Sequence, residues 1–180
     1  MSIIKFMSKF VDPIEILNKL NLKDDMTAAD FGCGSGGWVI PLAKILEQGI
    51  IYAIDVQEEM LSVLETKLKA ENIHNIRKVL LNIEDAQELK LPLLSCDLIL
   101  MTNLLFQVED KKQVFKQADK VLKRKGIILV VDWKPNNLLD PQKGKVSVDE
   151  VKKIAQEFNF ELKKEFSAGD YHYTLVFEKK

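Results

Sequence analysis

Short apolar runs alternate with amphipathic segments along most of the chain. Five of these runs are rich in isoleucine, valine, leucine and other apolar residues, and they lie at 27–32, 50–56, 75–81, 96–101 and 126–133. Continuous apolar runs of this length are typical of strands that are buried on both faces of a parallel sheet. The pattern therefore predicts five strands of a parallel sheet.

The segments between the apolar runs have the spacing of helices. Segment 57–71 carries leucines three and four residues apart, which makes one face of a helix apolar, and segment 108–123 has a similar pattern. Segment 38–48 is a third predicted helix, and Gly49 after it is a common type of C-terminal stop. Regular alternation of strands and helices predicts a doubly wound α/β fold.

The C-terminal part of the chain departs from this alternation. Residues 147–150 read Ser-Val-Asp-Glu, a capping box that predicts a helix to about Phe158. Two strand-like segments follow at 160–166 and 171–179, and the turn between them is too short for a crossover, so they predict a hairpin. The predicted fold class is therefore α/β, with a doubly wound seven-stranded sheet that is parallel except for one antiparallel strand from this hairpin.

Length and composition indicate one ordinary globular domain. The chain has 180 residues, of which 47% are hydrophobic, and a formal net charge of −1. A dedicated nucleic-acid-binding protein usually carries a basic excess, so no nucleic-acid partner is expected. We interpret the short basic run 123–125 as the solvated end of the preceding helix, with a phosphate contact as the alternative. We divide the domain into an N-terminal helical segment (1–24), a core (25–133) and a C-terminal part (134–180).

The sequence shows no pattern of a membrane span, a signal peptide or a metal site. No run approaches the roughly 20 apolar residues of a membrane helix, and the apolar start is interrupted by lysines and lacks a cleavage pattern. The two cysteines, Cys33 and Cys96, lie far apart, and the two histidines, His74 and His172, add no ligand cluster. We therefore expect a cytoplasmic protein with reduced thiols and no bound metal.

A glycine-rich turn follows the first predicted strand. Gly32, Gly34 and Gly37 match the G-x-G-x-x-G of dinucleotide-binding folds, whereas Gly32, Gly34 and Gly36 match the G-x-G-x-G of S-adenosylmethionine enzymes. A short-chain dehydrogenase would also need a tyrosine followed four residues later by a lysine. None of the three tyrosines has a lysine at that spacing, which disfavours a nicotinamide cofactor.

Five motifs in register carry a resemblance to a known family. They read ADFGCGSGG, YAIDVQEEML, CDLILMTNLLFQV, VLKRKGIILVVDWKP and YHYTLVFEK. With these motifs the chain resembles, over almost its whole length, the class I S-adenosylmethionine-dependent methyltransferases, and most of all the branch of ubiquinone- and menaquinone-biosynthesis-type enzymes. The resemblance implies a Rossmann-like form of the predicted sheet and S-adenosylmethionine as the cofactor. It also implies a cofactor-binding core over 25–133 and a substrate-side helix and hairpin over 134–180.

The resemblance further implies which residues bind the cofactor at the carboxyl ends of the strands. They are Asp30, Gly32, Gly34, Gly36, Asp55, Val56, Asn82, Ile83 and Asn103. We expect Asp55 to accept hydrogen bonds from both ribose hydroxyls, because a carboxylate offers acceptors and no donor; its alternative role is a helix cap. We expect Asp30 to face the positive charge of the cofactor, with a turn residue as the alternative. Asn82 is expected beside the adenine, with Asp85 as the alternative.

The catalytic candidates lie at the predicted mouth of the pocket. Methyl transfer from a sulfonium is an in-line displacement that depends mainly on the alignment of the two reactants, so no dedicated catalytic residue is required. The candidates are His172, Asn103 and Asp132. His172 is a candidate base because an ordinary imidazole pKa lies near neutrality, and a packing role is the alternative.

The methyl acceptor is expected to be a small molecule. The short segment 134–146 leaves little room for a structure that reads a macromolecule. The loop Thr-Asn-Leu-Leu-Phe at 102–106 also differs from the N-P-P-aromatic motif of amide and adenine N-methyltransferases. A protein or RNA methyltransferase and a non-catalytic S-adenosylmethionine-binding module are the alternatives.

Overall fold

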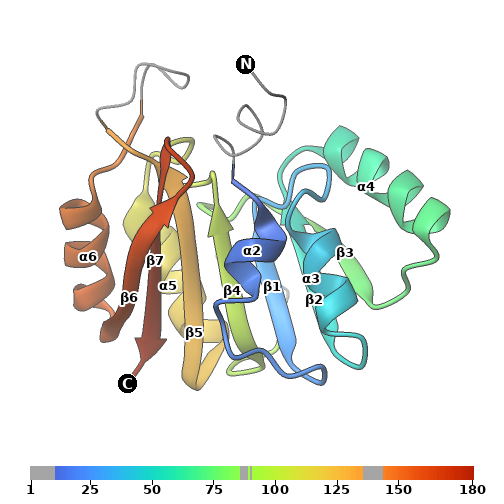
Figure 1. Ribbon diagram of the computed structural model, residues 1–180, viewed down its shortest axis with the longest axis horizontal. Coiled ribbons are helices and arrows are strands. Elements are labelled where there is room, and N and C mark those ends of the chain that lie inside the picture. Colours follow the sequence, from blue (N-terminus) through green and yellow to red (C-terminus); the bar gives the residue numbers. More distant parts are fainter. Residues whose placement is uncertain (1–10, 86–88, 90, 136–143) are drawn as a thin grey trace.

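A seven-stranded sheet lies between two layers of helices in the computed structural model of the chain (Figure 1). The structure describes residues 11–85, 89, 91–135 and 144–180. The strands are β1 (Thr27–Phe31), β2 (Ile50–Asp55), β3 (Ile76–Leu80), β4 (Cys96–Thr102), β5 (Leu122–Trp133), β6 (Phe160–Ala168) and β7 (His172–Lys179). The helices are α2 (Pro13–Leu17), α3 (Val39–Ile45), α4 (Glu58–Glu71), α5 (Lys111–Val121) and α6 (Val148–Glu157).

The strand order in the sheet is β3-β2-β1-β4-β5-β7-β6. Neighbouring strands from β3 to β5 are parallel, and β7 runs antiparallel to both β5 and β6. The predicted fold class, with one antiparallel strand from a C-terminal hairpin, is confirmed. After β1 the chain adds β2 and β3 on one side and then continues with β4 on the other side. In open α/β sheets, such a reversal of strand order opens a crevice at the carboxyl ends of the strands.

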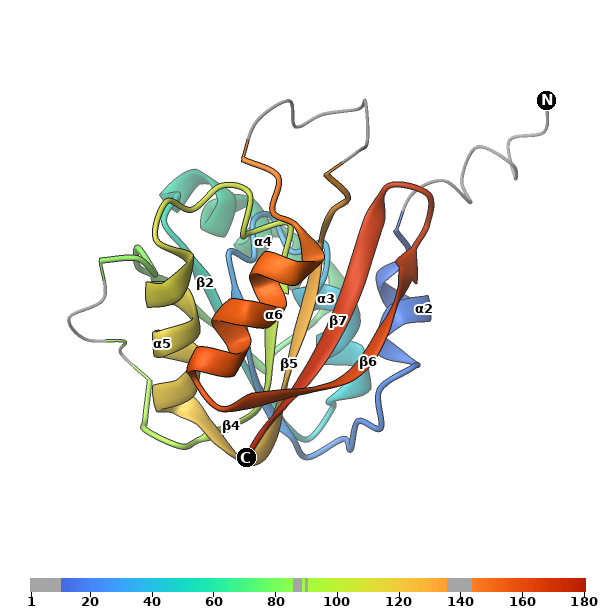
Figure 2. The same ribbon diagram turned by 90° about the vertical axis from the view of Figure 1, so that its left-hand side faces the viewer.

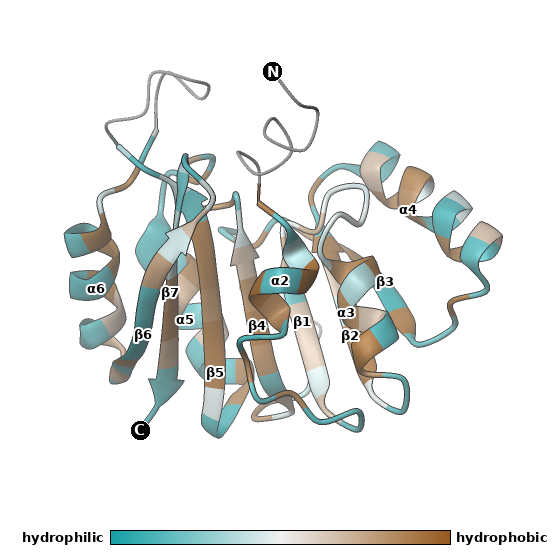
Figure 3. Ribbon diagram, in the orientation of Figure 1, coloured by the Kyte–Doolittle hydropathy of each residue, from teal (hydrophilic) through white to brown (hydrophobic). Residues whose placement is uncertain are grey.

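The two faces of the sheet are covered by different helices, and the core is divided between them. In β1, Ala28 packs on the side of α2, α3 and α4, whereas Ala29 and Phe31 pack on the side of α5 and α6 (Figure 2). Leu98 and Ile99 of β4 divide in the same way, because successive residues of a strand point to opposite faces. Both faces are apolar, which explains why the central strands read as continuous apolar runs (Figure 3).

The predicted C-terminal elements form as expected. The Oγ of Ser147 accepts a hydrogen bond from the Glu150 amide at 3.1 Å, so the N-cap predicted for α6 is confirmed. Helix α6 buries Val151, Ile154 and Ala155 against the sheet. The hairpin of β6 and β7 is also confirmed, and it brings the start of β7 to the carboxyl end of β5.

The end of α3 differs from the sequence prediction. This helix ends at Ile45, so Gly49 is not its C-terminal stop. A Cβ atom at position 49 would overlap the carbonyl oxygen of Met26. The glycine therefore serves a close approach of two backbone segments before β2, which a local sequence pattern does not distinguish from a helix stop.

The boundary between α5 and β5 also differs. Helix α5 ends at Val121, and residues 123–125, which we predicted as a solvated helix end, belong to β5. Lys123 Nζ lies 2.8 Å from Asp97 Oδ1, and Lys125 adopts a positive φ of 66°. A buried leucine at position 122 fits the apolar face of either element, so tertiary pairing with β4 decides the boundary.

Helix α2 represents the predicted N-terminal helical segment. Asp12 caps it, with Oδ1 accepting from the Ile14 amide at 2.9 Å, and Ile16 and Leu17 are buried in the core. The first ten residues of the predicted segment 1–24 lie outside the described residues. Within the described ranges, no helix combines the length and the apolar character that crossing a membrane requires.

Candidate functional site

The glycine loop turns sharply between β1 and α3. Gly32, Gly34 and Gly36 have φ values of 76°, 51° and 98°, in the left-handed region that favours glycine, whereas Gly37 has no such φ. The amides at the start of the loop are held by β2, because the Gly32 and Cys33 N–H groups both donate to the Ile54 carbonyl at 2.9 Å. The backbone therefore uses its glycines in the G-x-G-x-G pattern.

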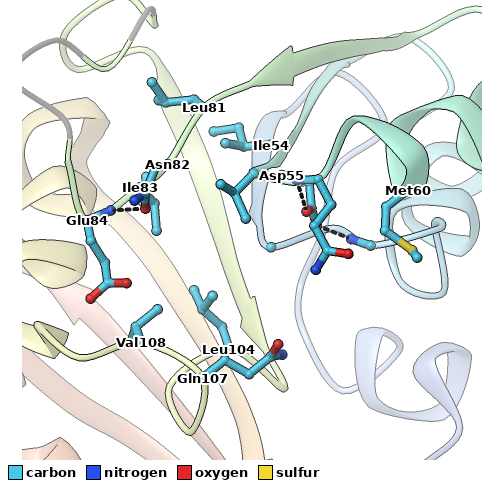
Figure 4. Close-up of a pocket in the computed structure, with 14 residues that line it drawn as sticks. Ile54, Asp55, Met60, Leu81, Asn82, Ile83, Glu84, Leu104, Gln107 and Val108 are labelled. Atoms are coloured by element: carbon cyan, nitrogen blue, oxygen red, sulfur yellow. Dashed lines mark hydrogen bonds between the residues drawn. The ribbon is translucent and has the colours of Figure 1, made fainter.

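A cavity of about 350 Å³ lies beside this loop, at the carboxyl ends of β1, β2, β3 and β4 (Figure 4). Four segments and one side chain of α4 form its walls. They contribute Gly32, Gly34, Ile54, Asp55, Val56, Gln57, Met60, Leu81, Asn82, Ile83, Glu84, Leu104, Gln107 and Val108. Of the nine residues that the sequence indicated for the cofactor, six line this cavity, and Asp30, Gly36 and Asn103 are not among its lining residues.

Asp55 joins two walls of the cavity. Its Oδ2 accepts from the Gly34 amide at 2.7 Å, and its Oδ1 accepts from the Gln57 amide at 2.9 Å. The residue is only 8% exposed. The N-cap of α4 is Gln57, so Asp55 supports the start of that helix without being its cap. Each carboxylate oxygen has a second lone pair, so both oxygens can still accept a hydrogen bond from a ligand.

The two candidates for the residue beside the adenine, Asn82 and Asp85, both follow β3 but differ in their position relative to the cavity. Asn82 lines the cavity, and its Oδ1 accepts from the Glu84 amide at 3.0 Å (Figure 4). Ile83 also lines the cavity and is buried. Asp85 is exposed and is not a lining residue of the cavity.

Asp30 is fully buried at the carboxyl end of β1. Neither of its carboxylate oxygens has a hydrogen-bond partner in the described part of the chain. Burial raises the pKa of Asp30 well above its ordinary value, and the negative charge of Asp55 raises it further. A buried carboxyl group in this state favours either a proton or a nearby cation.

Asp132 and Asn103 lie at the ends of the neighbouring strands. Asp132 is fully buried, and its carboxylate accepts from the Leu105 amide at 2.8 Å and from the Trp133 amide at 2.7 Å. Burial raises the pKa of Asp132 to about 6, although these backbone hydrogen bonds act in the opposite direction. Asn103 has a φ of 51°, and its amide donates to the Val131 carbonyl at 2.8 Å. Asp132 therefore anchors the loop that follows β4.

His172 opens β7 and faces Trp133 of β5, with the ring centroids 4.1 Å apart. It is 3% exposed, and neither ring nitrogen has a hydrogen-bond partner in the described ranges. Burial, together with the smaller effect of the Lys134 charge, lowers the pKa of His172 to about 4. The expectation that this imidazole titrates near neutrality is therefore wrong, because the buried ring disfavours the protonated form.

Several cavity residues were missed by reasoning from the sequence. They are Ile54, Gln57, Met60, Leu81, Glu84, Leu104, Gln107 and Val108. All but Met60 lie at or shortly after the carboxyl end of a strand, which is the signal that could have indicated them. Among the described residues, no group of three or more His, Cys, Asp or Glu side chains is placed to hold a metal ion, and the expectation of no metal stays a prediction. Cys33 and Cys96 are buried and free.

Comparisons with known proteins agree with this geometry. A family model described as a methyltransferase domain matches residues 22–177. The demethylmenaquinone methyltransferase of Geobacillus stearothermophilus is 30% identical over 132 residues, which cover 73% of this chain and 55% of that protein. A probable cobalt-precorrin-6B C(15)-methyltransferase of Methanosarcina mazei is 46% identical over 61 residues, 34% of this chain and 33% of the relative. The chain thus spans about half the length, or less, of these curated relatives.

The fold is shared with solved structures. A structure described as a SAM-dependent methyltransferase from Aquifex aeolicus superposes with a TM-score of 0.85 at 24% identity, covering 98% of this chain and 97% of that one. A structure described as a putative type 11 methyltransferase from Sulfolobus solfataricus gives a TM-score of 0.78 at 24% identity, with 95% and 94% covered. Family model, relatives and fold agree, and the chain belongs to the class I S-adenosylmethionine-dependent methyltransferases.

Proposed function

We propose that this chain binds S-adenosylmethionine in the cavity beside the glycine loop and transfers its methyl group to a small molecule. The observation that carries the proposal is Asp55. This carboxylate holds Gly34 and Gln57 in place, lines the cavity, and keeps acceptor capacity on both oxygens. A pair of adjacent hydroxyls, as on a ribose, is the group that this arrangement suits.

Other residues of the cavity, and Asp30 at the end of β1, which is not a lining residue, suit the remaining parts of the cofactor. Gly34 has a positive φ and no heavy atom within 4 Å of the place where a Cβ would lie, so a ligand can approach its backbone closely. The unpartnered buried carboxyl of Asp30 suits the positive charge of the methionine end. Asn82 and the buried Ile83 lie where the adenine would pack. A volume of about 350 Å³ is within the usual range for a ligand site.

In this proposal the protein acts mainly by positioning. The cofactor supplies an electrophilic methyl group when it is bound. The glycine loop and Asp55 would hold the methionine and ribose parts of the cofactor in the crevice, and the loop that Asp132 anchors forms the wall on the β4 side. Alignment of two reactants can supply much of the rate enhancement, on the order of 7–11 kcal/mol in ideal cases. His172 is neutral above about pH 4, but the lowered pKa makes its ring a weak base, so its role as a base stays a prediction.

A small-molecule acceptor is supported by the relatives and by the charge of the chain. The relatives' names specify demethylmenaquinone and a cobalt-precorrin, which are not macromolecules. The net charge of −1 gives no basic excess for a nucleic acid. Residues 136–143 of segment 134–146 lie outside the described residues, so the expected role of this segment beside the acceptor stays a prediction. The division of the domain into three parts and the cytoplasmic location also stay predictions.

Calorimetry with S-adenosylhomocysteine tests the proposed cofactor site. Asp55→Asn keeps the size of the side chain but replaces one carboxylate oxygen with an NH₂ group. This donor would then face the Gly34 or the Gln57 backbone N–H, each of which donates to Asp55 in the wild type. We expect affinity to fall by about 2 kcal/mol or more, roughly thirtyfold. The matched control is Asp85→Asn, an exposed carboxyl near the rim, which should stay within about twofold of the wild type. Saturable NAD binding without any response to S-adenosylhomocysteine would overturn the proposal.

A tritiated-methyl assay on a fractionated cell extract tests the acceptor class. Label that appears in the low-mass fraction supports a small-molecule methyltransferase. Label in protein or RNA would contradict it. Tight cofactor binding with no label in any fraction would favour a non-catalytic binding module.

A further inference from the structure

Glu84 connects two walls of the cavity that are far apart in the sequence. It follows β3 and lines the cavity together with Asn82 and Ile83. Its Oε1 accepts hydrogen bonds from the amides of Glu109 and Asp110, both at 2.7 Å. These two amides end the segment 104–110, which contributes Leu104, Gln107 and Val108 to the cavity (Figure 4).

The position of Glu84 is favourable for electrostatic reasons. The Asp110 amide lies at the N-terminus of α5, where backbone N–H groups lack partners within the helix. A carboxylate is favoured there by the helix dipole, and its hydrogen bonds to N–H groups are stronger than neutral ones. Asp110 itself caps the helix, with Oδ1 accepting from the Gln113 amide at 2.9 Å. The N-terminus of α5 is therefore held by two carboxylates, its own cap Asp110 and Glu84 from the segment after β3.

The segment 104–110 is held at both ends by carboxylates from other strands. Asp132, at the end of β5, accepts from the Leu105 amide near its beginning. Glu84, after β3, accepts from the two amides at its end. Of the apolar side chains in this segment, Leu104 and Val108 line the cavity and Leu105 is buried in the core. The shape of this wall thus depends on both carboxylates, and Glu84 supplies hydrogen bonds that link it to the segment 81–84.

We propose that Glu84 is a positioning residue for the cofactor, a latch that joins segment 81–84 to segment 104–110. This inference rests on the proposed function, because it assumes that the cofactor occupies this cavity. Without the carboxylate, both segments gain conformational freedom, and binding then has to order them. Ordering of loops on binding lowers affinity without removing any direct contact to the ligand. The affinity for the cofactor therefore depends on a side chain that acts through the position of two walls.

Three variants test the latch. Glu84→Ala removes both hydrogen bonds, whereas Glu84→Gln keeps an amide oxygen that can accept from the same two N–H groups. Glu109→Ala is the control, because it removes one carboxylate from the facing segment 104–110 but leaves the backbone amide that donates to Glu84 in place. Calorimetry with S-adenosylhomocysteine should show an affinity about tenfold weaker for Glu84→Ala, which corresponds to about 1.4 kcal/mol. Glu84→Gln should stay within about threefold of the wild type, and the control within about twofold.

Amide hydrogen exchange measured by NMR supplies an independent readout. The Glu109 and Asp110 amides should lose protection in Glu84→Ala and keep most of it in Glu84→Gln. Wild-type affinity in a Glu84→Ala protein whose two amides have lost protection would overturn the latch. Weakening by both Glu84→Gln and Glu109→Ala as large as that of Glu84→Ala would also overturn it, because the effect would then follow charge alone. A wild-type protein that does not bind S-adenosylhomocysteine would instead refute the cofactor site itself.

Discussion

Replacing Gly36 with alanine should destabilise the protein, while the same change at Gly37 should not. Gly36 has a φ of 98°, and a Cβ there would lie 2.6 Å from Leu64 Cδ1 and 2.9 Å from Ile40 Cδ1. Both of these side chains are buried, so neither can move aside freely. Gly37 has no left-handed φ and no heavy atom within 4 Å of its Cβ position.

The size of the effect follows from two separate penalties. A left-handed φ costs a residue with a Cβ about 1–2 kcal/mol, and overpacking of a filled core costs about 1–3 kcal/mol. Alanine also reduces the conformational freedom of the unfolded chain, which stabilises the folded state by about 0.4–1 kcal/mol and partly offsets these two penalties. We therefore expect Gly36→Ala to lower the free energy of unfolding by about 2–4 kcal/mol. Only the last term applies to Gly37→Ala, which should be neutral or stabilising by up to about 1 kcal/mol.

Urea denaturation at 25 °C followed by far-UV circular dichroism measures both variants. With a slope of about 2 kcal/mol per M urea, Gly36→Ala should move the unfolding midpoint down by about 1–2 M. The midpoint for Gly37→Ala should stay unchanged or rise slightly. If Gly37→Ala lost as much stability as Gly36→Ala, the G-x-G-x-G interpretation of the loop would be wrong. A wild-type midpoint for Gly36→Ala would contradict the packing argument.

Four further predictions concern the titration of two buried groups, adenine recognition and thiol reactivity. The pKa of His172 is lowered to about 4, so between about pH 4 and pH 6.5 the unfolded chain binds more protons than the folded one. The free energy of unfolding of the wild type, measured in urea titrations, should therefore rise by up to about 3 kcal/mol relative to His172→Asn over this range. The pKa of Asp132 is raised to about 6, so between about pH 4 and pH 6 the folded chain binds more protons than the unfolded one. The free energy of unfolding of the wild type should therefore fall by about 2–3 kcal/mol relative to Asp132→Asn as the pH rises over this range. Asn82→Ala should weaken S-adenosylhomocysteine binding by about 1 kcal/mol in calorimetry and Asp85→Ala should not, because only Asn82 lines the cavity; equal losses would count against this. Burial raises the pKa of both cysteine thiols, so iodoacetamide at pH 8 should alkylate the native protein roughly tenfold more slowly than the urea-unfolded chain, and equal rates would contradict this.

The elements of the fold could be predicted because their signals are local. Apolar runs indicated β1 to β5, and the turn between two strand-like segments indicated the hairpin of β6 and β7. Helix boundaries were less predictable where a residue suits two elements. Leu122 is buried whether it closes α5 or opens β5, and only its pairing with Cys96 of β4 selects the strand.

In the candidate site, too, some features could be predicted from the sequence and others only from the tertiary structure. The sequence by itself determined the glycine loop and placed Asp55 at the end of a strand, because these features depend on residues that are neighbours in the chain. The tertiary structure decided that Gly36 rather than Gly37 is required, since Leu64 packs against it from another helix. It also decided that Glu84 meets the Glu109 amide and that burial makes His172 neutral. Contacts between strand ends and the loss of solvent around a side chain arise only when distant segments pack together, and no local pattern encodes them.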